Sequence, residues 1–196
     1  MTKTEICNRA LAVLGHDRTI SDFDGTTEGV YNDMSEEAVR CRQFFDPALK
    51  NCIAEHDWDF LAVERNLGTL HPDEFGWVRI VLPPDALRVV LVSDAEGKPF
   101  RIRRNRDAVD AQTHGDFARL RYISDDIDIE TLPHSFQEAV IYQLAYLISG
   151  PMFGDAKKSE GYMNLARMKL SDALSKETDE TAYRGATENR FINARR

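Results

Sequence analysis

Residues Asp33 to Leu61, DMSEEAVRCRQFFDPALKNCIAEHDWDFL, decide the fold because they predict one long amphipathic helix. Ser35 stands just before Glu36 and Glu37, which is the pattern of an N-cap with acidic residues in the first turn. At ~1.5 Å per residue, a helix over residues 35–57 would be about 35 Å long. One face of it is predicted to be dry and to hold Ala38, Cys41, Phe45, Leu49, Cys52 and Ile53.

Pro47 falls inside this helix and predicts a kink or two abutting helices, because proline removes a backbone donor. Upstream, residues 4–14 predict a short amphipathic helix that Thr2 or Thr4 can cap and that Gly15 ends. Residues 15–32 are polar and rich in Gly, Asp and Thr, which is typical of a loop.

Two more helices are predicted near the end of the chain, at 134–149 and 155–176. The stretch from Phe136 to Ile148 is apolar on nearly every side, so it should be the most buried helix. Gly150-Pro151 should stop that helix, and Asp155 should cap the next one.

The middle of the chain changes to a period near two, which is typical of strands. Strands are predicted over Trp77–Leu82, Leu87–Ser93 and Phe117–Ile123, with a fourth around Phe100 and Ile102. The connections between them are short, so the strands should form an antiparallel sheet. The predicted fold is therefore α+β: an antiparallel-style helical bundle with an inserted antiparallel β module.

Four regions follow from this pattern: bundle helices over 1–61, the β module over 62–130, bundle helices over 131–176, and an extended tail over 177–196. The tail has few apolar residues and no period, so it is not expected to fold by itself.

Composition limits the function classes. The chain has 196 residues, enough for one domain with an inserted module, and a net charge of −8, which argues against a protein that coats nucleic acid. No stretch is long and apolar enough to predict a membrane span or a leader. Cys7, Cys41 and Cys52 all stand at apolar helix positions and should be reduced core side chains.

Asp22-Phe23-Asp24-Gly25-Thr26 matches the DxDGT nucleophile loop of haloacid-dehalogenase-type phosphatases. In those enzymes the first Asp attacks phosphorus and the second is the acid/base. That chemistry needs the loop at the carboxyl end of a buried parallel strand, and residues 15–21 predict no strand. A solvated loop is the expectation, and a phosphatase that uses Asp22 and Asp24 is kept as the alternative function.

Metal and cofactor sites are not predicted. Asp125, Asp126, Asp128 and Glu130 lack the Gly and Glu spacing of an EF-hand, so they are expected to be an acidic linker. The five histidines have neither HxxxH spacing nor a CxxC partner motif. No catalytic, cofactor-binding or metal-binding residue is therefore assigned.

One basic cluster stands out in the β module. It is predicted to be a charged sheet surface, or else a surface for an acidic partner or for a neighbouring copy of this negative chain. Its members are Arg101, Arg103, Arg104, Arg106, Arg119 and Arg121.

The order of several short phrases resembles the tail tubular protein A, or head-to-tail adaptor, family of short-tailed bacteriophages. The resemblance covers roughly residues 5–175. The phrases are Ala10-Leu11 to Leu14-Gly15, Glu37-Ala38 with Cys41, Leu49 to His56, Trp58, Phe60, Trp77, Leu82-Pro83-Pro84-Asp85-Ala86-Leu87-Arg88-Val89, Tyr122-Ile123, Phe136, Ala139, Leu144-Ala145 and Gly150-Pro151.

The resemblance implies a helical bundle with an inserted β module, assembled as a dodecameric ring between portal and tail. It implies no catalysis and no cofactor. The implied partners are the portal protein, a tail nozzle or tail tube protein, other copies of the chain, and DNA only in transit through the lumen. The implied location is the head-tail junction of the virion, after assembly in the bacterial cytoplasm.

In related adaptors the C-terminal segment docks onto the portal, which on this chain is about residues 177–196. The implied portal-binding residues are Tyr183, Arg184, Arg190, Phe191, Ile192, Arg195 and Arg196. Plain disorder of the tail, and a host assembly or chaperone module that neither forms a ring nor binds a portal, remain open alternatives.

Overall fold

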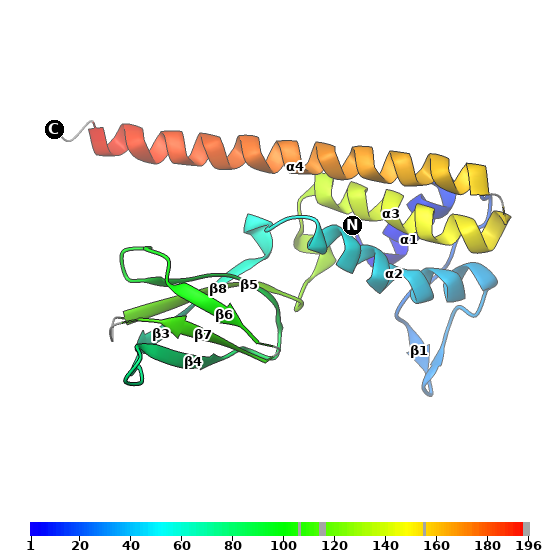
Figure 1. The fold of residues 1–196 in the computed structure, drawn as a ribbon. Helices are drawn as coiled ribbons and strands as arrows, with labels where there is room; N and C mark the ends of the chain where they lie inside the picture. Colours follow the sequence, from blue (N-terminus) through cyan, green and yellow to red (C-terminus); the bar gives the residue numbers. More distant parts are fainter. Residues whose placement is uncertain (106, 114–116, 155, 194–196) are drawn as a thin grey trace. The chain divides into compact units, whose positions relative to one another are not determined.

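The computed structural model describes residues 1–105, 107–113, 117–154 and 156–193, and side chains within these ranges except Phe117 and those from position 179 onward. Its fold is α+β, as predicted, with four α-helices and antiparallel sheets (Figure 1). The chain forms two compact units. Unit 1 holds residues 1–56 and 128–196, and unit 2 holds residues 57–127. The β module was predicted over residues 62–130, so unit 2 begins and ends slightly earlier in the chain than that prediction.

The helices of unit 1 are α1 (Lys3–Val13), α2 (Glu36–Ala54), α3 (His134–Phe153) and α4 (Ala156–Asn193), with a short 3-10 helix, η2 (Ile129–Thr131), before α3. Thr2 caps α1 by accepting from the Glu5 amide, and the Glu5 side chain accepts from the Thr2 amide, a complete capping box. Ser35 caps α2 by accepting from the Ala38 amide at 3.2 Å.

Helix α3 is the centre of the bundle. It contacts α1, α2 and α4, and its buried residues lie on most sides of the helix. The prediction that this helix is the most buried one is confirmed, because no other helix of the described chain has as many buried residues. Phe136, Val140, Leu144 and Ile148 are all fully enclosed.

Two helix boundaries differ from the predictions. Helix α3 runs through Gly150-Pro151 and ends at Gly154, whose φ of 59° is a left-handed value that glycine adopts without a Cβ clash. Helix α2 is continuous over Pro47, so the alternative of two abutting helices is wrong. Within α2 the buried face includes Ala48, while the predicted core residue Leu49 is only half-buried. The predicted cap Asp155 lies outside the described residues.

Helix α4 also corrects the sequence analysis, because it continues to Asn193 where an extended tail was predicted. The segment 177–193 lacks an apolar period, but it follows directly on an existing helix and contains no proline. Extending a helix adds one hydrogen bond per residue and needs no new nucleus. At ~1.5 Å per residue the whole helix is about 57 Å long.

Unit 2 contains a short 3-10 helix, η1 (Asp59–Leu61), followed by six strands in two three-stranded antiparallel sheets, with strand orders β3-β8-β5 and β4-β7-β6. The strands are β3 (Ala62–Thr69), β4 (Trp77–Val81), β5 (Ala86–Asp94), β6 (Arg101–Arg104), β7 (Ala108–Gln112) and β8 (Phe117–Ser124). Both sheets contribute to one core, formed by Ile80, Val89, Val92, Val109, Ala111, Leu120 and Tyr122.

Strands β3 and β7 were not predicted. Their sequences, AVERNLGT and AVDAQ, contain charged residues, glycine and alanine, which have low β-propensity. Both pair along most of their length with strands that were predicted, β8 and β4. Pairing and burial of Val109 and Ala111 therefore outweigh the local preference.

The turn between β4 and β5 leads from one sheet to the other. The Asp85 side chain accepts hydrogen bonds from the Tyr122 hydroxyl at 3.0 Å and the Ser124 hydroxyl at 2.9 Å, both on β8. The Ser124 bond is the main cause that lowers the pKa of Asp85, and burial is the main cause that raises the pKa of Tyr122. The phrase Leu82 to Val89 thus joins the two sheets.

Candidate functional site

The DFDGT stretch lies in a loop of unit 1 that no strand precedes: residues 14–25 contain neither helix nor strand. The Asp22 carboxylate accepts from the Gly25 amide at 2.9 Å and from the Asn32 side-chain amide at 3.2 Å. The Gly25 bond and then the Asn32 bond hold the pKa of Asp22 below its usual value. Asp24 forms an ion pair with Lys3 at 3.1 Å.

Gly25 and Phe23 have structural roles in the same loop. A Cβ on Gly25 would lie 1.7 Å from a carboxylate oxygen of Asp22, so any larger residue would displace that carboxylate. Phe23 is buried and packs on Phe45 of α2, with ring centroids 5.1 Å apart. The DxDGT match is therefore explained by loop structure, and the strand that phosphatase chemistry requires is absent from this described region.

This loop forms the base of a small hairpin that the sequence analysis missed. Strand β1 (Thr26–Thr27) pairs with β2 (Val30–Tyr31) in antiparallel register. The turn residues Glu28 and Gly29 have φ values of 53° and 80°, the double positive φ of a type I′ turn. The signal was a two-residue X-Gly turn between β-branched residues, Thr27 and Val30. Figure 1 shows the hairpin projecting from the helices of unit 1.

Asp33 fixes the hairpin to the start of α2. Its carboxylate accepts from the Ser21 amide at 2.7 Å, the Ser21 hydroxyl at 3.0 Å and the Ser35 amide at 2.9 Å. Hydrogen bonds from Ser35 and then from Ser21 hold the pKa of Asp33 well below its ordinary range. Arg42 of α2 supports the other side: its guanidinium lies 4.1 Å from the Tyr31 ring centroid and donates to the Asp33 carbonyl.

The hairpin anchor should therefore depend on acid pH. The folded-state pKa of Asp33 is lower than its unfolded value, so its stabilisation is full above the ordinary Asp pKa of about 3.9 and is lost as pH falls through the folded value. We expect the amide proton shifts of Ser21 and Ser35 to stay constant down to about pH 4 and to titrate below it. Asp33→Asn should abolish that titration in NMR spectra. Ser21→Ala, which removes one donor, should move the midpoint upward. A midpoint at the ordinary value in the wild type would contradict this anchor.

Three of the described histidines each lie near a different carboxylate. His16 contacts Glu37 at 2.9 Å, His56 lies 3.6 Å from Glu177, and His134 lies 3.8 Å from Glu138. His114 lies outside the described residues. In the part of the chain that is described, no group of three or more His, Cys, Asp or Glu side chains could hold a metal ion. The three cysteines are buried and in thiol form, as predicted for core side chains.

The acidic stretch 125–130 is exposed at all four of its carboxylates. Asp128 caps the 3-10 helix η2 by accepting from the Glu130 amide at 3.0 Å. Asp126 of the same stretch uses its backbone: its amide donates to the Ser124 hydroxyl at 3.1 Å. The stretch is therefore a structured acidic connection to α3.

The predicted arginine cluster is divided between two sheets. Arg101, Arg103 and Arg104 lie on β6, whereas Arg119 and Arg121 lie on β8 of the other sheet. Arg121 is paired with Asp59 at 2.5 Å. Arg103 covers the ring of Trp77, 4.1 Å from its centroid. Arg106 lies outside the described residues.

The predicted portal-binding residues lie in or beyond the end of α4. The backbone at Tyr183, Arg184, Arg190, Phe191 and Ile192 is helical. Arg195 and Arg196 lie outside the described residues. The register of α4 against α3 is antiparallel, since Ser159 bonds Ser149 at 3.0 Å and Lys169 pairs with Glu138 at 3.5 Å. Position 174 is therefore level with the start of α3, and the rest of α4 extends past it.

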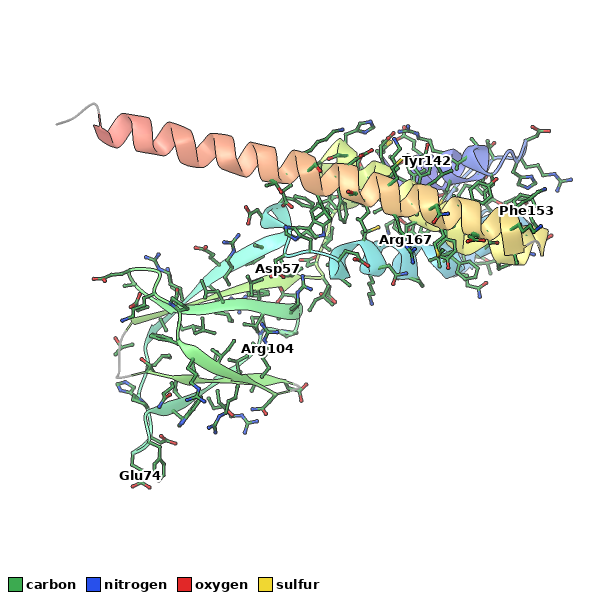
Figure 2. All side chains as sticks on the ribbon, turned by 45° about the horizontal axis from the view of Figure 1, so that its top comes forward. Asp57, Glu74, Arg104, Tyr142, Phe153 and Arg167 are labelled. Atoms are coloured by element: carbon green, nitrogen blue, oxygen red, sulfur yellow. The ribbon has the colours of Figure 1, made fainter. Side chains whose placement is uncertain are left out.

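Unit 1 also has a groove of about 530 Å³ between α2, α3 and α4. Figure 2 labels Arg167, one of its lining residues on α4. No histidine or cysteine is among the described residues of the lining, so a Ser–His or Cys–His pair is not formed by them. The lining residues are Asn51, Ala54, Glu55, Gln143, Tyr146, Met163, Arg167, Leu170, Ser171 and Leu174.

No protein-family profile and no curated protein matches the chain. Among solved structures, the chain is similar to one in the "Virion of native gene transfer agent (GTA) particle", with 15% identity and a TM-score of 0.32. The match covers 86% of this chain and 88% of that chain. No helix in the described ranges has both the length and the apolar character needed to cross a bilayer.

Proposed function

We propose that this protein is a structural virion protein, a head-to-tail adaptor. In this proposal it forms a dodecameric ring that joins the portal to the tail and lines part of the DNA ejection channel. The observation that carries the proposal is the ordered set of sequence phrases on a chain that folds as a helical bundle with an inserted antiparallel module. That is the architecture which the resemblance to the adaptor family implies.

The positions of these phrases in the fold support the proposal. Leu144 and Ala145 lie fully buried in α3, at the centre of the bundle. Asp85, within the phrase Leu82 to Val89, holds the turn between the two sheets to β8. These parts of the phrases therefore fall on residues that specify this architecture. Proteins with the same fold are expected to resemble one another at such residues.

The proposed partners are the portal protein at one end of the ring and a tail nozzle or tail tube protein at the other. The part of α4 that extends beyond α3 is the proposed portal-docking segment. DNA would pass through the lumen without lasting contact, because a chain with a net charge of −8 repels phosphates. The proposed location is the head-tail junction of the virion.

A reconstruction of phage particles tests the proposal. The expected result is a ring of copies of this chain between portal and tail. Mass measurement after mixing the purified chain with portal is the simpler version and should give a complex of a ring with the portal. Absence of the chain from intact particles would end the proposal, as would magnesium-dependent hydrolysis of a phosphate ester that Asp22→Asn abolishes.

A further inference from the structure

Two surfaces in the described part of the chain each combine exposed apolar side chains with a net charge. One surface is net positive and the other is net negative. The first, called the sheet face, is the side of sheet β4-β7-β6 that faces away from the core. Alternate residues of β4 and β7, such as Val78, Ile80 and Val109, face the core. The sheet face consists of Trp77, Arg79 and Val81 on β4 and Arg101 and Arg103 on β6, with Phe75 in the preceding turn.

The sheet face has the composition of a protein interface. Phe75 is 72% exposed and Val81 is 77% exposed, and Trp77 lies between them under the Arg103 guanidinium. Trp and Arg are enriched among residues that dominate binding energy. A shallow depression of about 580 Å³, lined by Phe75, Trp77, Arg79 and Arg103 among others, lies on this face.

The sheet face is also net positive. Its three arginines, Arg79, Arg101 and Arg103, outnumber the two carboxylates at the depression, Asp73 and Asp110. The Asp73 carboxylate accepts from the Phe75 and Trp77 amides, both at 2.9 Å, and Asp110 accepts from the Asn105 side chain at 2.8 Å. Asp110 also lies opposite Arg79 and Arg103 in the strand register. The three arginines exceed the two carboxylates by one, so the face keeps a small net positive charge for an acidic partner.

The second surface, called the hairpin surface, lies on unit 1. It consists of Val30 and Tyr31 of β2, Met34 before α2, and Val39 of α2, together with Glu28 and Glu36. Val30 is 59% exposed and Met34 is 61% exposed. Residues 19–39 contain six acidic residues and no Lys or Arg. Four basic side chains from outside this range lie against it: Lys3 on Asp24, Arg18 on Glu37, Arg40 on Glu36 and Arg42 on the Tyr31 ring. The acidic residues outnumber them, so this surface is apolar and net negative.

We infer that the hairpin surface of one copy docks on the sheet face of a neighbouring copy. The charges are opposite, and both surfaces offer apolar side chains that a partner would cover. The two surfaces lie at different places on the chain, so the contact is heterologous, repeats from copy to copy and can close into a ring. The inference deepens the proposed adaptor ring and rests on it only for closure. The contact itself is a property of the purified chain.

Single-stranded nucleic acid is the other ligand that a sheet with Arg and Trp can hold. Two carboxylates at the depression and a net charge of −8 oppose phosphate binding. The exposed valine, Val81, adds nothing to base stacking, whereas it suits a protein partner. The observations therefore favour a second copy of the chain.

Charge exchange tests the contact by sedimentation of the full chain at low and high salt. The sheet variant is Arg79→Glu with Arg101→Glu, and the hairpin variant is Glu28→Lys with Glu36→Lys. Each variant alone should associate at least about tenfold more weakly than the wild type, because like charges then meet. An equimolar mixture should recover association, since every contact in it pairs opposite charges again.

The matched control is Arg65→Glu with Arg104→Glu, which makes the same charge change off the sheet face. Arg104, labelled in Figure 2, lies on β6 next to Arg103, on the opposite side of the strand. The control should associate as the wild type does. Circular dichroism should show that every variant is folded.

Three outcomes would overturn the inference: a wild type that stays monomeric at both salt concentrations, single variants that associate normally, or a mixture that does not recover. Loss of binding to a single-stranded oligonucleotide in the sheet variant, with self-association unchanged, would instead assign this face to nucleic acid. Virions that contain a normal ring of the sheet variant would end this inference and leave the adaptor proposal standing. Virions that lack the wild-type chain would end the adaptor proposal.

Discussion

A chain that ends at Lys176 is expected to fold and to lose its binding to the portal. Among the α4 side chains that the structure describes, the buried ones are Ala166 and Ala173, and both precede the cut. We therefore expect the packing of α4 on α3 to be kept. The removed residues extend past the start of α3 and include all the proposed portal anchors. In a pull-down with purified portal, the wild type should bind and the truncated chain should not. The circular dichroism spectrum of the truncated chain should still be that of a folded helical protein.

The truncation also removes the 3.6 Å contact between His56 and Glu177, so a second variant separates the two effects. A chain that ends at Thr178 retains Glu177 and still lacks the anchors. Both truncated chains should fail to bind portal. If the longer chain bound normally and the shorter one did not, the loss of the His56–Glu177 contact and not of the terminal segment would be the cause. Unchanged binding by both would show that the portal docks elsewhere.

The helical backbone of 177–193 changes how docking is understood. An extended tail would pay conformational entropy when it orders on the portal, which weakens binding for a given contact area. A segment that is already helical needs less ordering and can lie in a groove of its partner as a preformed helix. Alanine substitutions at Tyr183 and Phe191 would therefore test whether these two residues are binding anchors of the helical segment.

The sequence predicted the elements that burial specifies and missed those that pairing specifies. The 3.6-residue period of α2 and the continuous apolar run of α3 are visible in the sequence because each helix buries its own face. Strand β7 has an alanine- and aspartate-rich sequence and exists because β4 and β6 pair with it on both sides. Such a strand has no signal of its own, since its stability depends on its neighbours.

The candidate surfaces were partly visible for the same reason. Arg101 and Arg103 were predicted to belong to a charged sheet surface, and they share one face of β6, because alternation follows from the strand itself. That Arg119 and Arg121 belong to the other sheet depends on the order of strands, which residue spacing does not encode. The hairpin was missed because its two-residue strands are shorter than any period, although Glu28-Gly29 was a usable turn signal.

Replacing Leu144 by alanine should lower the free energy of unfolding of the helical unit by about 2–5 kcal/mol. Leu144 is fully buried in α3, the helix that contacts the other three, so the cavity would lie where little can collapse into it. Leu165→Ala on α4 is the matched control. It makes the same change at a side chain that is 38% exposed, and it should cost under about 1 kcal/mol.

The two units can be followed separately in one denaturation experiment, which makes this prediction sharp. Both tryptophans, Trp58 and Trp77, lie in unit 2, whereas all four α-helices lie in unit 1. Leu144→Ala should therefore move the far-ultraviolet circular dichroism transition in urea to lower concentration and leave the tryptophan fluorescence transition in place. An unmoved circular dichroism midpoint would contradict the central position of α3. A fluorescence midpoint that moves by the same amount would show that the two units unfold as one, because cooperative unfolding makes both probes report a single transition.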